Sequence, residues 1–148
     1  MKNRDFTTKI LLQEPPREVF AAIKNVADWW SGEVTGSADR VGDEFTYRYK
    51  DFHVSRQRVT ELVENRKIVW RVVDSSLNFV AHKNEWNGTD ITFEIARKGD
   101  QTELRFTHVG LGPEHECYGA CSNGWTSLIS GNLRSLITAG KAISLEKL

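Results

Sequence analysis

A change of hydrophobic period along the chain constrains its fold more than any other feature. Between residues 44 and 109, apolar side chains recur at every second position in several short stretches, and turn residues separate these stretches without an intervening helix. After Gly112-Pro113, apolar side chains recur at the helical period of about 3.6. A period of two is typical of a strand with one buried face. The pattern therefore predicts an antiparallel sheet of consecutive strands, followed by one long C-terminal helix.

The strands of this sheet are separated by recognisable turns. Residues 64–66 (Glu-Asn-Arg) and 98–101 (Lys-Gly-Asp-Gln) are typical turn sequences. Residues 77–88 follow no period, and we expect an irregular strand or loop there. The predicted strands, of which the second is the least regular, cover residues 45–50, 53–63, 68–73, 91–96 and 104–109.

The N-terminal region predicts one further strand and a short helix. Residues 6–12 mix β-branched and polar side chains and stop before Pro15-Pro16, which cannot continue a sheet ladder. Pro16 suits the first turn of a helix, and apolar residues then recur at helical spacing as far as Trp29-Trp30. The Gly and Ser residues of segment 31–37 predict a break. We expect one amphipathic helix between Pro16 and Trp30.

The C-terminal helix is predicted from an apolar stripe on one side and polar residues on the opposite side, with Gly140 in the place of a C-terminal cap. Its length is about seven turns, or about 40 Å. Gly119, Gly124 and Gly131 lie within it at a cost of about 1 kcal/mol each relative to Ala, so we expect a close backbone approach or a bend. The stripe consists of Tyr118, Cys121, Trp125, Leu128, Ile129, Leu133, Leu136 and Ile137.

Length and composition exclude several classes of protein. The 148 residues include 20 Lys+Arg and 20 Asp+Glu. This length predicts a single domain over residues 1–148, and the zero net charge argues against a nucleic-acid partner, which favours a basic surface. The apolar runs are far shorter than the ~20 residues that cross a bilayer, and the charged N-terminus is unlike a signal peptide. Two cysteines are too few for a disulfide scaffold, and we expect a cytoplasmic protein.

Several short segments, in this order and at this spacing, resemble a known family. They are residues 15–23, 29–30, 42–45, 58–62, 68–70, 88–93, 102–104, 107–108 and 124–125, with Leu133 and Gly140. Across about residues 6–141 the chain resembles the START-like helix-grip (SRPBCC) superfamily, and within it the activator-of-heat-shock-protein-ATPase homologue (Aha-type) branch. The resemblance implies an α+β fold in which a curved antiparallel β-sheet wraps around a long C-terminal α-helix, with short helical segments after the first strand.

The resemblance also implies a hydrophobic cavity between the sheet and the C-terminal helix. Because this superfamily includes lipid carriers, hormone receptors, cyclases and co-chaperone domains, the fold alone leaves three functions open. We expect binding of a small hydrophobic or aromatic ligand in this cavity. The alternatives are an enzyme of the polyketide cyclase type, and a co-chaperone-like interaction module connected with the stress response. A homodimer or a protein partner also stays open, and no cofactor is implied.

Side chains on the inward faces of the predicted elements are candidate ligand-binding residues. Aromatic rings there would line an apolar pocket in which tyrosine hydroxyls anchor the ligand, although the same rings would also fill a core. His108 lies on the buried face of its strand, where it could bind a ligand oxygen or act as a general acid or base. A buried histidine more often has structural partners. The candidates are Tyr47, Tyr49, Trp70, Phe93, Phe106, His108, Trp125, Ile129 and Leu133.

A zinc site is the alternative that two cysteines suggest. His108, His115, Cys117 and Cys121 could supply the four ligands that zinc takes. Helical geometry turns His115 away from Cys117, however, and four-residue cysteine spacing is a weak pattern. We therefore expect no metal.

The remaining polar and aromatic clusters predict no site. Trp29-Trp30 could form an exposed partner-binding patch, but such a pair is more often part of a core. His53, His82, Arg56 and Arg58 show no spacing typical of a site, and we expect solvated strand faces. The common motifs for nucleotides, acyl nucleophiles and zinc proteases are absent from the sequence.

Overall fold

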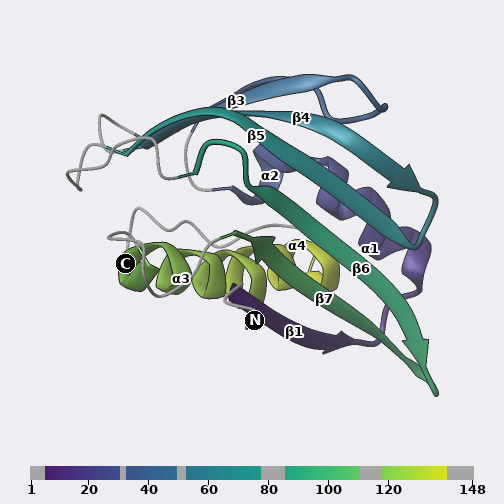
Figure 1. Cartoon of the computed structure of the whole chain (residues 1–148). Helices are drawn as coiled ribbons and strands as arrows, with labels where there is room; N and C mark the ends of the chain where they lie inside the picture. Colours follow the sequence, from purple (N-terminus) through teal and green to yellow (C-terminus); the bar gives the residue numbers. More distant parts are fainter. Residues whose placement is uncertain (1–5, 31–32, 50–52, 78–85, 111–117, 140–148) are drawn as a thin grey trace.

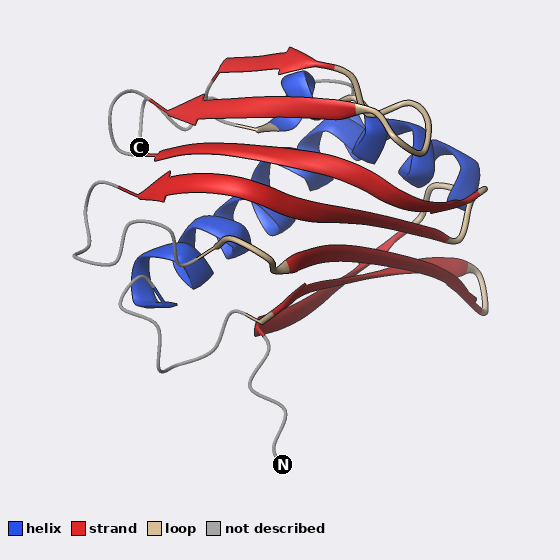
Figure 2. Ribbon diagram, turned by 45° about the horizontal axis from the view of Figure 1, so that its top comes forward, coloured by secondary structure: helices blue, strands red, loops and turns tan. Residues whose placement is uncertain are grey.

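Seven antiparallel strands form one sheet, and the helices lie along its concave face (Figures 1 and 2). The computed structural model describes residues 6–30, 33–49, 53–77, 86–110 and 118–139. The strand order is β1-β7-β6-β5-β4-β3-β2, so β1 and β2 form the two edges. The predicted α+β helix-grip fold is confirmed. In chain order, the elements are β1 (Phe6–Leu12), α1 (Pro16–Lys24), α2 (Val26–Trp29), β2 (Glu33–Gly36), β3 (Glu44–Tyr49), β4 (His53–Val63), β5 (Lys67–Leu77), β6 (Asp90–Lys98), β7 (Gln101–Val109), α3 (Tyr118–Ser127), the π-helical segment η1 (Leu128–Leu133) and α4 (Arg134–Ala139).

The sheet follows the predicted alternation closely. In β7, Leu104, Phe106 and His108 are fully buried, whereas Arg105 between them is exposed. The pairing of β4 with β5 shifts its register between Arg56 and Gln57 and again between Val59 and Glu61. Such irregularities bend a strand and increase its twist, which helps these two long strands curve over the helices.

The first helical region differs from the single helix that the period predicts. Helix α1 begins at Pro16 as expected, but it ends at Lys24, and Asn25 leaves the helical conformation with φ −84° and ψ 63°. The Asn25 N–H donates to the Ala22 carbonyl, which closes the last turn of α1, and the short helix α2 follows in a new direction. The apolar spacing continues across Asn25, so the period alone does not reveal this break.

Strand β2 is also outside the sequence prediction. Its four residues are too few to show an alternation, and the glycine that ends it predicts a break. Gly36 has φ +101°, and a Cβ atom built there would clash with the Glu44 carbonyl oxygen. This position therefore needs glycine for the close pairing with β3.

The C-terminal helical run contains a π-helical segment that was not predicted. Residues 118–139 are continuous, but the backbone of η1 is wound more widely than an α-helix. A Cβ atom at Gly124 or Gly131 would meet no atom within 4 Å, so the prediction of a close backbone approach is wrong at these two glycines. Gly140, the predicted cap, lies outside the described residues, and the surroundings of Gly119 and the side chains of Tyr118 and Cys121 are not described either. In the part of the chain that the structure describes, no helix is both long and apolar enough to cross a membrane.

Candidate functional site

One end of the core contains uncharged polar side chains among aromatic rings. It lies where β4 and β6 begin and where β5 and β7 end. We call the group His53, Ser55, Gln57, Trp86 and His108 the polar end. Ser55, Gln57 and His108 are at most 1% exposed, so each of their polar atoms needs a partner inside the protein or in a ligand.

His108 is held by two hydrogen bonds that determine its tautomer. Trp125 Nε1 donates to His108 Nδ1 at 3.0 Å. Thr89 Oγ1, which lies 2.7 Å from His108 Nε2, donates its own proton to the Trp86 carbonyl at 2.6 Å. Because an indole N–H only donates, Nδ1 must accept, and the imidazole proton resides on Nε2 and faces Thr89. His108 is therefore neutral, and both of its ring nitrogens form hydrogen bonds within the protein. This agrees with a structural role, the alternative to ligand binding that the sequence left open.

His53 begins a second chain of hydrogen bonds along the concave face of β4. Its Nε2 lies 3.1 Å from Ser55 Oγ, and Gln57 Nε2 donates to the same hydroxyl at 2.8 Å. Burial lowers the pKa of His53 from 6.5 to about 4, because the charged imidazolium would lose its hydration there. His53 is thus neutral at physiological pH.

A closed circuit of aromatic contacts joins these two polar chains. Trp30 stacks on Tyr47 at 4.3 Å between ring centroids, and Tyr47 meets His53 edge-on at 5.2 Å. His53 meets Trp86 edge-on at 4.5 Å, and Trp86 stacks on Trp125 at 5.7 Å. The Trp125 ring lies 5.2 Å from the Trp30 ring between centroids, which closes the circuit. Because the five rings come from five different parts of the chain, only the tertiary structure assembles this circuit.

Two buried polar atoms of the polar end have no hydrogen-bond partner. They are Gln57 Oε1, an acceptor, and Trp86 Nε1, a donor. Three more such atoms among the described residues lie elsewhere, on Glu14, Trp70 and Asn132. A buried polar atom without a partner costs about 1–3 kcal/mol. The polar end carries this cost twice, within a group of side chains that contact one another.

The residues predicted from the sequence to bind a ligand all lie on the inside of the protein. Tyr47, His108 and Trp125 belong to the circuit or contact it, and Phe106 packs on Trp125 at 4.5 Å. Trp70, Phe93, Ile129 and Leu133 are fully buried in the packed core, while Tyr49 is partly buried against it. Contact of these nine side chains with a ligand stays a prediction.

Four residues of the polar end are not predicted from the sequence as site residues, namely His53, Ser55, Gln57 and Trp86. The prediction of a solvated His53 is wrong, because its ring lies on the concave face between Tyr47 and Trp86. Counting back from buried Val59 in steps of two would have placed Gln57, Ser55 and His53 on the inward face. No comparable signal exists for Trp86, which lies in the turn over residues 86–88.

The structure also tests the other candidate residues from the sequence, namely the tryptophan pair, the two arginines and the possible metal ligands. Trp29 and Trp30 are 0% and 5% exposed, so they belong to the core and do not form a surface patch. Arg56 and Arg58 lie on the solvated outer face as expected, where both approach Glu44. His82, His115 and Cys117 lie outside the described residues. Within the described part of the chain, no group of three His, Cys, Asp or Glu side chains could hold a metal ion.

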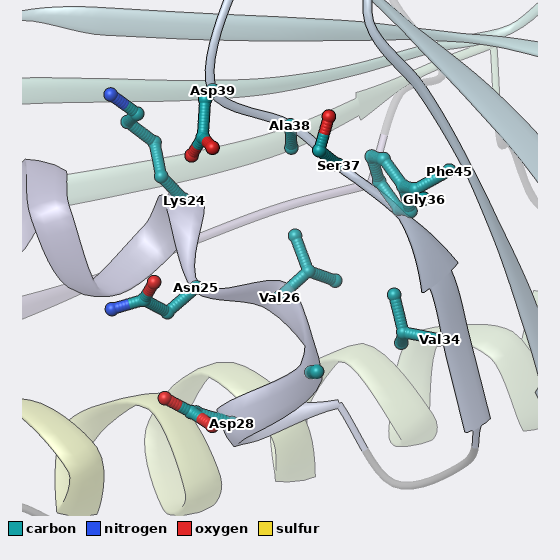
Figure 3. Close-up of a pocket in the computed structure, with 11 residues that line it drawn as sticks. Lys24, Asn25, Val26, Asp28, Val34, Gly36, Ser37, Ala38, Asp39 and Phe45 are labelled. Atoms are coloured by element: carbon teal, nitrogen blue, oxygen red, sulfur yellow. The ribbon is translucent and has the colours of Figure 1, made fainter.

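A separate surface hollow of about 210 Å³ lies between the α1–α2 junction and the β2–β3 connection (Figure 3). Lys24 and Asp39 lie near one end of it, and Asp28 lies near the other. Buried Val26 and Ala38 contribute to its apolar lining, but most of its polar side chains are exposed to water. Polar groups do not converge on one point of this hollow, so it is a weaker candidate than the polar end.

Comparisons with known proteins agree on the fold. The family model described as Activator of Hsp90 ATPase homolog 1-like protein matches residues 13–138. No curated protein sequence matches the chain significantly.

Several solved structures are similar. The Aha1 dimer from Colwellia psychrerythraea is 22% identical with a TM-score of 0.74, and the match covers 93% of this chain and 98% of that one. Protein MLL2253 from Mesorhizobium loti is 16% identical with a TM-score of 0.73, over 95% and 100% of the two chains. DynU16, a protein in the dynemicin biosynthetic locus, is 15% identical with a TM-score of 0.71, over 95% of this chain and 49% of its own. At these low sequence identities, the structural similarity shows that the proteins share a fold and shows nothing of their function.

Proposed function

The chain belongs to the Activator of Hsp90 ATPase homolog 1-like family, and from this premise we propose that it binds a small hydrophobic or aromatic molecule at the polar end of its core. The observation that carries the proposal is the pair of unpartnered buried atoms, Gln57 Oε1 and Trp86 Nε1. Local rules of folding are most often broken at functional sites. A bound molecule that supplies the missing partners would explain why this end of the core is polar.

The surroundings of these atoms suit a flat apolar ligand. Trp86, Trp125 and Tyr47 place aromatic rings next to the two polar chains, which is the usual composition of a small-molecule site. Burial of apolar area stabilises such a complex by roughly 25 cal/mol per Å², before the costs of association are subtracted. DynU16, with the same fold, is a protein in a biosynthetic locus, which also favours a small-molecule ligand.

Simple binding is better supported than acid–base catalysis. His108 has both ring nitrogens in hydrogen bonds, so neither is free to accept a proton from a substrate. Burial lowers the pKa of His53 to about 4, which makes it a weak base near neutral pH. A polyketide-cyclase-type reaction would need one of these imidazoles to leave its present partners.

Native mass spectrometry of the freshly purified protein tests the proposal directly. We expect an apolar small molecule at near-stoichiometric amount, which denaturing extraction then releases for identification. Gln57→Leu and Trp86→Phe should lose this molecule, whereas Arg58→Met should keep it, because Arg58 is the outward-facing neighbour of Gln57. Retention of the molecule by Gln57→Leu and Trp86→Phe alike would show that it binds elsewhere.

A co-chaperone-like interaction is the second candidate, because the matched family is described as an activator of the Hsp90 ATPase. The outer face of the sheet, with exposed Arg48 on β3 and Arg71 on β5, would provide its surface. Adding the protein to purified Hsp90 and measuring ATP hydrolysis tests this role. Stimulation that survives Gln57→Leu but not Arg48→Glu would favour it, and the absence of stimulation would exclude it.

We also propose a homodimer, since the similar Colwellia structure is described as a dimer. Light scattering coupled to size-exclusion chromatography measures the mass of the particle directly. A mass near 16.9 kDa, that of one chain, at all concentrations would contradict this proposal.

A further inference from the structure

We infer that the ligand of the polar end is an uncharged aromatic molecule with a hydroxyl-type group that both donates and accepts a hydrogen bond. This inference rests on the proposed function and specifies its ligand class. It follows from the charge, the unpartnered atoms and the ring surfaces of the site.

The charge of the site is the first argument. The buried side chains on the concave face of β3, β4 and β5 include no Asp, Glu, Lys or Arg among the described residues. The nearby charged side chains, such as Arg56 and Arg58, lie on the outer face. His53 and His108 are both neutral, as their burial and hydrogen bonds require. A charged ligand would lose its hydration here without meeting an opposite charge among the described side chains, which is strongly unfavourable.

The two unpartnered atoms are the second argument, because one needs a hydrogen-bond donor from the ligand and the other needs an acceptor. Gln57 Oε1 can only accept, so the ligand must bring a donor; Trp86 Nε1 can only donate, so the ligand must bring an acceptor. Contacts from Gln57 to Ser55, from Ser55 to His53 and from His53 to Trp86 link these two residues, so both atoms belong to one connected group of side chains. A hydroxyl group meets both requirements with one atom, while a ligand with separate polar groups would meet them with two.

The ring surfaces are the third argument. Tyr47 and Trp86 both meet the His53 ring edge-on, with interplanar angles of 84° and 86°. Trp86 also stacks on Trp125, so aromatic rings surround the polar atoms of this end. Flat aromatic rings make favourable stacked or edge-on contacts with such rings.

A matched series of naphthalene derivatives separates these three requirements. Isothermal titration calorimetry at pH 7.5 would compare 2-naphthol, 2-methoxynaphthalene, naphthalene, 2-naphthoate and 2-naphthylmethylammonium. We expect 2-naphthol to bind tightest, with a loss of about tenfold for the methoxy compound, which lacks the donor. Naphthalene should lose about another tenfold, and the two ions should bind at least about 100-fold more weakly than 2-naphthol.

Two variants assign the hydrogen bonds to their residues. Gln57→Leu removes the acceptor and should abolish the preference for 2-naphthol over 2-methoxynaphthalene. Trp86→Phe removes the indole N–H and should abolish the preference for 2-methoxynaphthalene over naphthalene. Both variants are compared at equal folded fraction, which circular dichroism measures. An unchanged preference in either variant would overturn the assignment of that hydrogen bond.

The outcomes also separate this inference from the proposed function. Equal or tighter binding of 2-naphthoate or 2-naphthylmethylammonium would refute an uncharged ligand, while the function of small-molecule binding would stand. If none of the five probes binds and native mass spectrometry finds no small molecule, the proposed function fails together with the inference.

Discussion

The hydrogen bond between Trp125 and His108 makes a strong prediction about stability. It connects the C-terminal helix to the last strand of the sheet, and both residues are at most 2% exposed. His108→Leu keeps most of the side-chain volume but removes the acceptor, so the Trp125 N–H becomes a buried donor without a partner. His108→Gln keeps an acceptor and a donor on one flexible side chain.

The expected magnitude follows from the number of partners that are lost. An orphaned buried N–H costs about 1–3 kcal/mol, and the lost bond to Thr89 adds about 1 kcal/mol. We expect His108→Leu to lower the free energy of unfolding by about 3 kcal/mol. For a chain of this length each kcal/mol lowers the melting temperature by about 3 °C, so the melting temperature should fall by about 9 °C. His108→Gln should lose less than half as much.

A double-mutant cycle with Trp125→Phe isolates the hydrogen bond from the effects of packing. In the Trp125→Phe background no indole N–H remains to be orphaned, so His108→Leu should cost about 1–2 kcal/mol less than in the wild type. Urea denaturation monitored by circular dichroism gives the four unfolding free energies. A coupling energy below about 0.3 kcal/mol would refute the view that this bond joins helix and sheet.

Three further predictions concern titration, backbone conformation and surface charge. Because the pKa of His53 is about 4 in the folded protein and 6.5 in the unfolded chain, the unfolded chain binds more protons between these values. When the pH is lowered from neutral to 4.5, the free energy of unfolding should therefore fall about 2 kcal/mol more in the wild type than in His53→Gln. Equal shifts of the urea midpoint in the two proteins would contradict this. Gly36→Ala should lower the free energy of unfolding by about 2 kcal/mol or more, because Gly36 has a positive φ and a Cβ atom there would clash with Glu44. Gly124→Ala should stabilise its helix by up to about 1 kcal/mol. A lower melting temperature for Gly124→Ala than for Gly36→Ala would refute both expectations. Arg58→Ala removes a half-exposed ion pair with Glu44 and should cost less than about 1 kcal/mol, so a larger loss in urea denaturation would contradict it.

The strands and their buried faces could be predicted because the signal is local. Side chains alternate across a strand with a period of two, so residues such as Leu104, Phe106 and His108 identify their own buried face. The break at Asn25 and the π-helical segment could not be predicted in the same way. Both change the backbone over one turn while the apolar spacing continues on either side of them.

The candidate site could be predicted only in part, and the reason is also physical. The sequence by itself determined that Tyr47, His108 and Trp125 face inward, since that depends on positions within one element. Only the tertiary structure decided that His108 accepts from Trp125, and that Trp86 and Gln57, which carry an unpartnered donor and acceptor, belong to one group of contacting side chains. These contacts join residues far apart in the chain, and strand register and helix packing set their distances, which no local periodicity encodes.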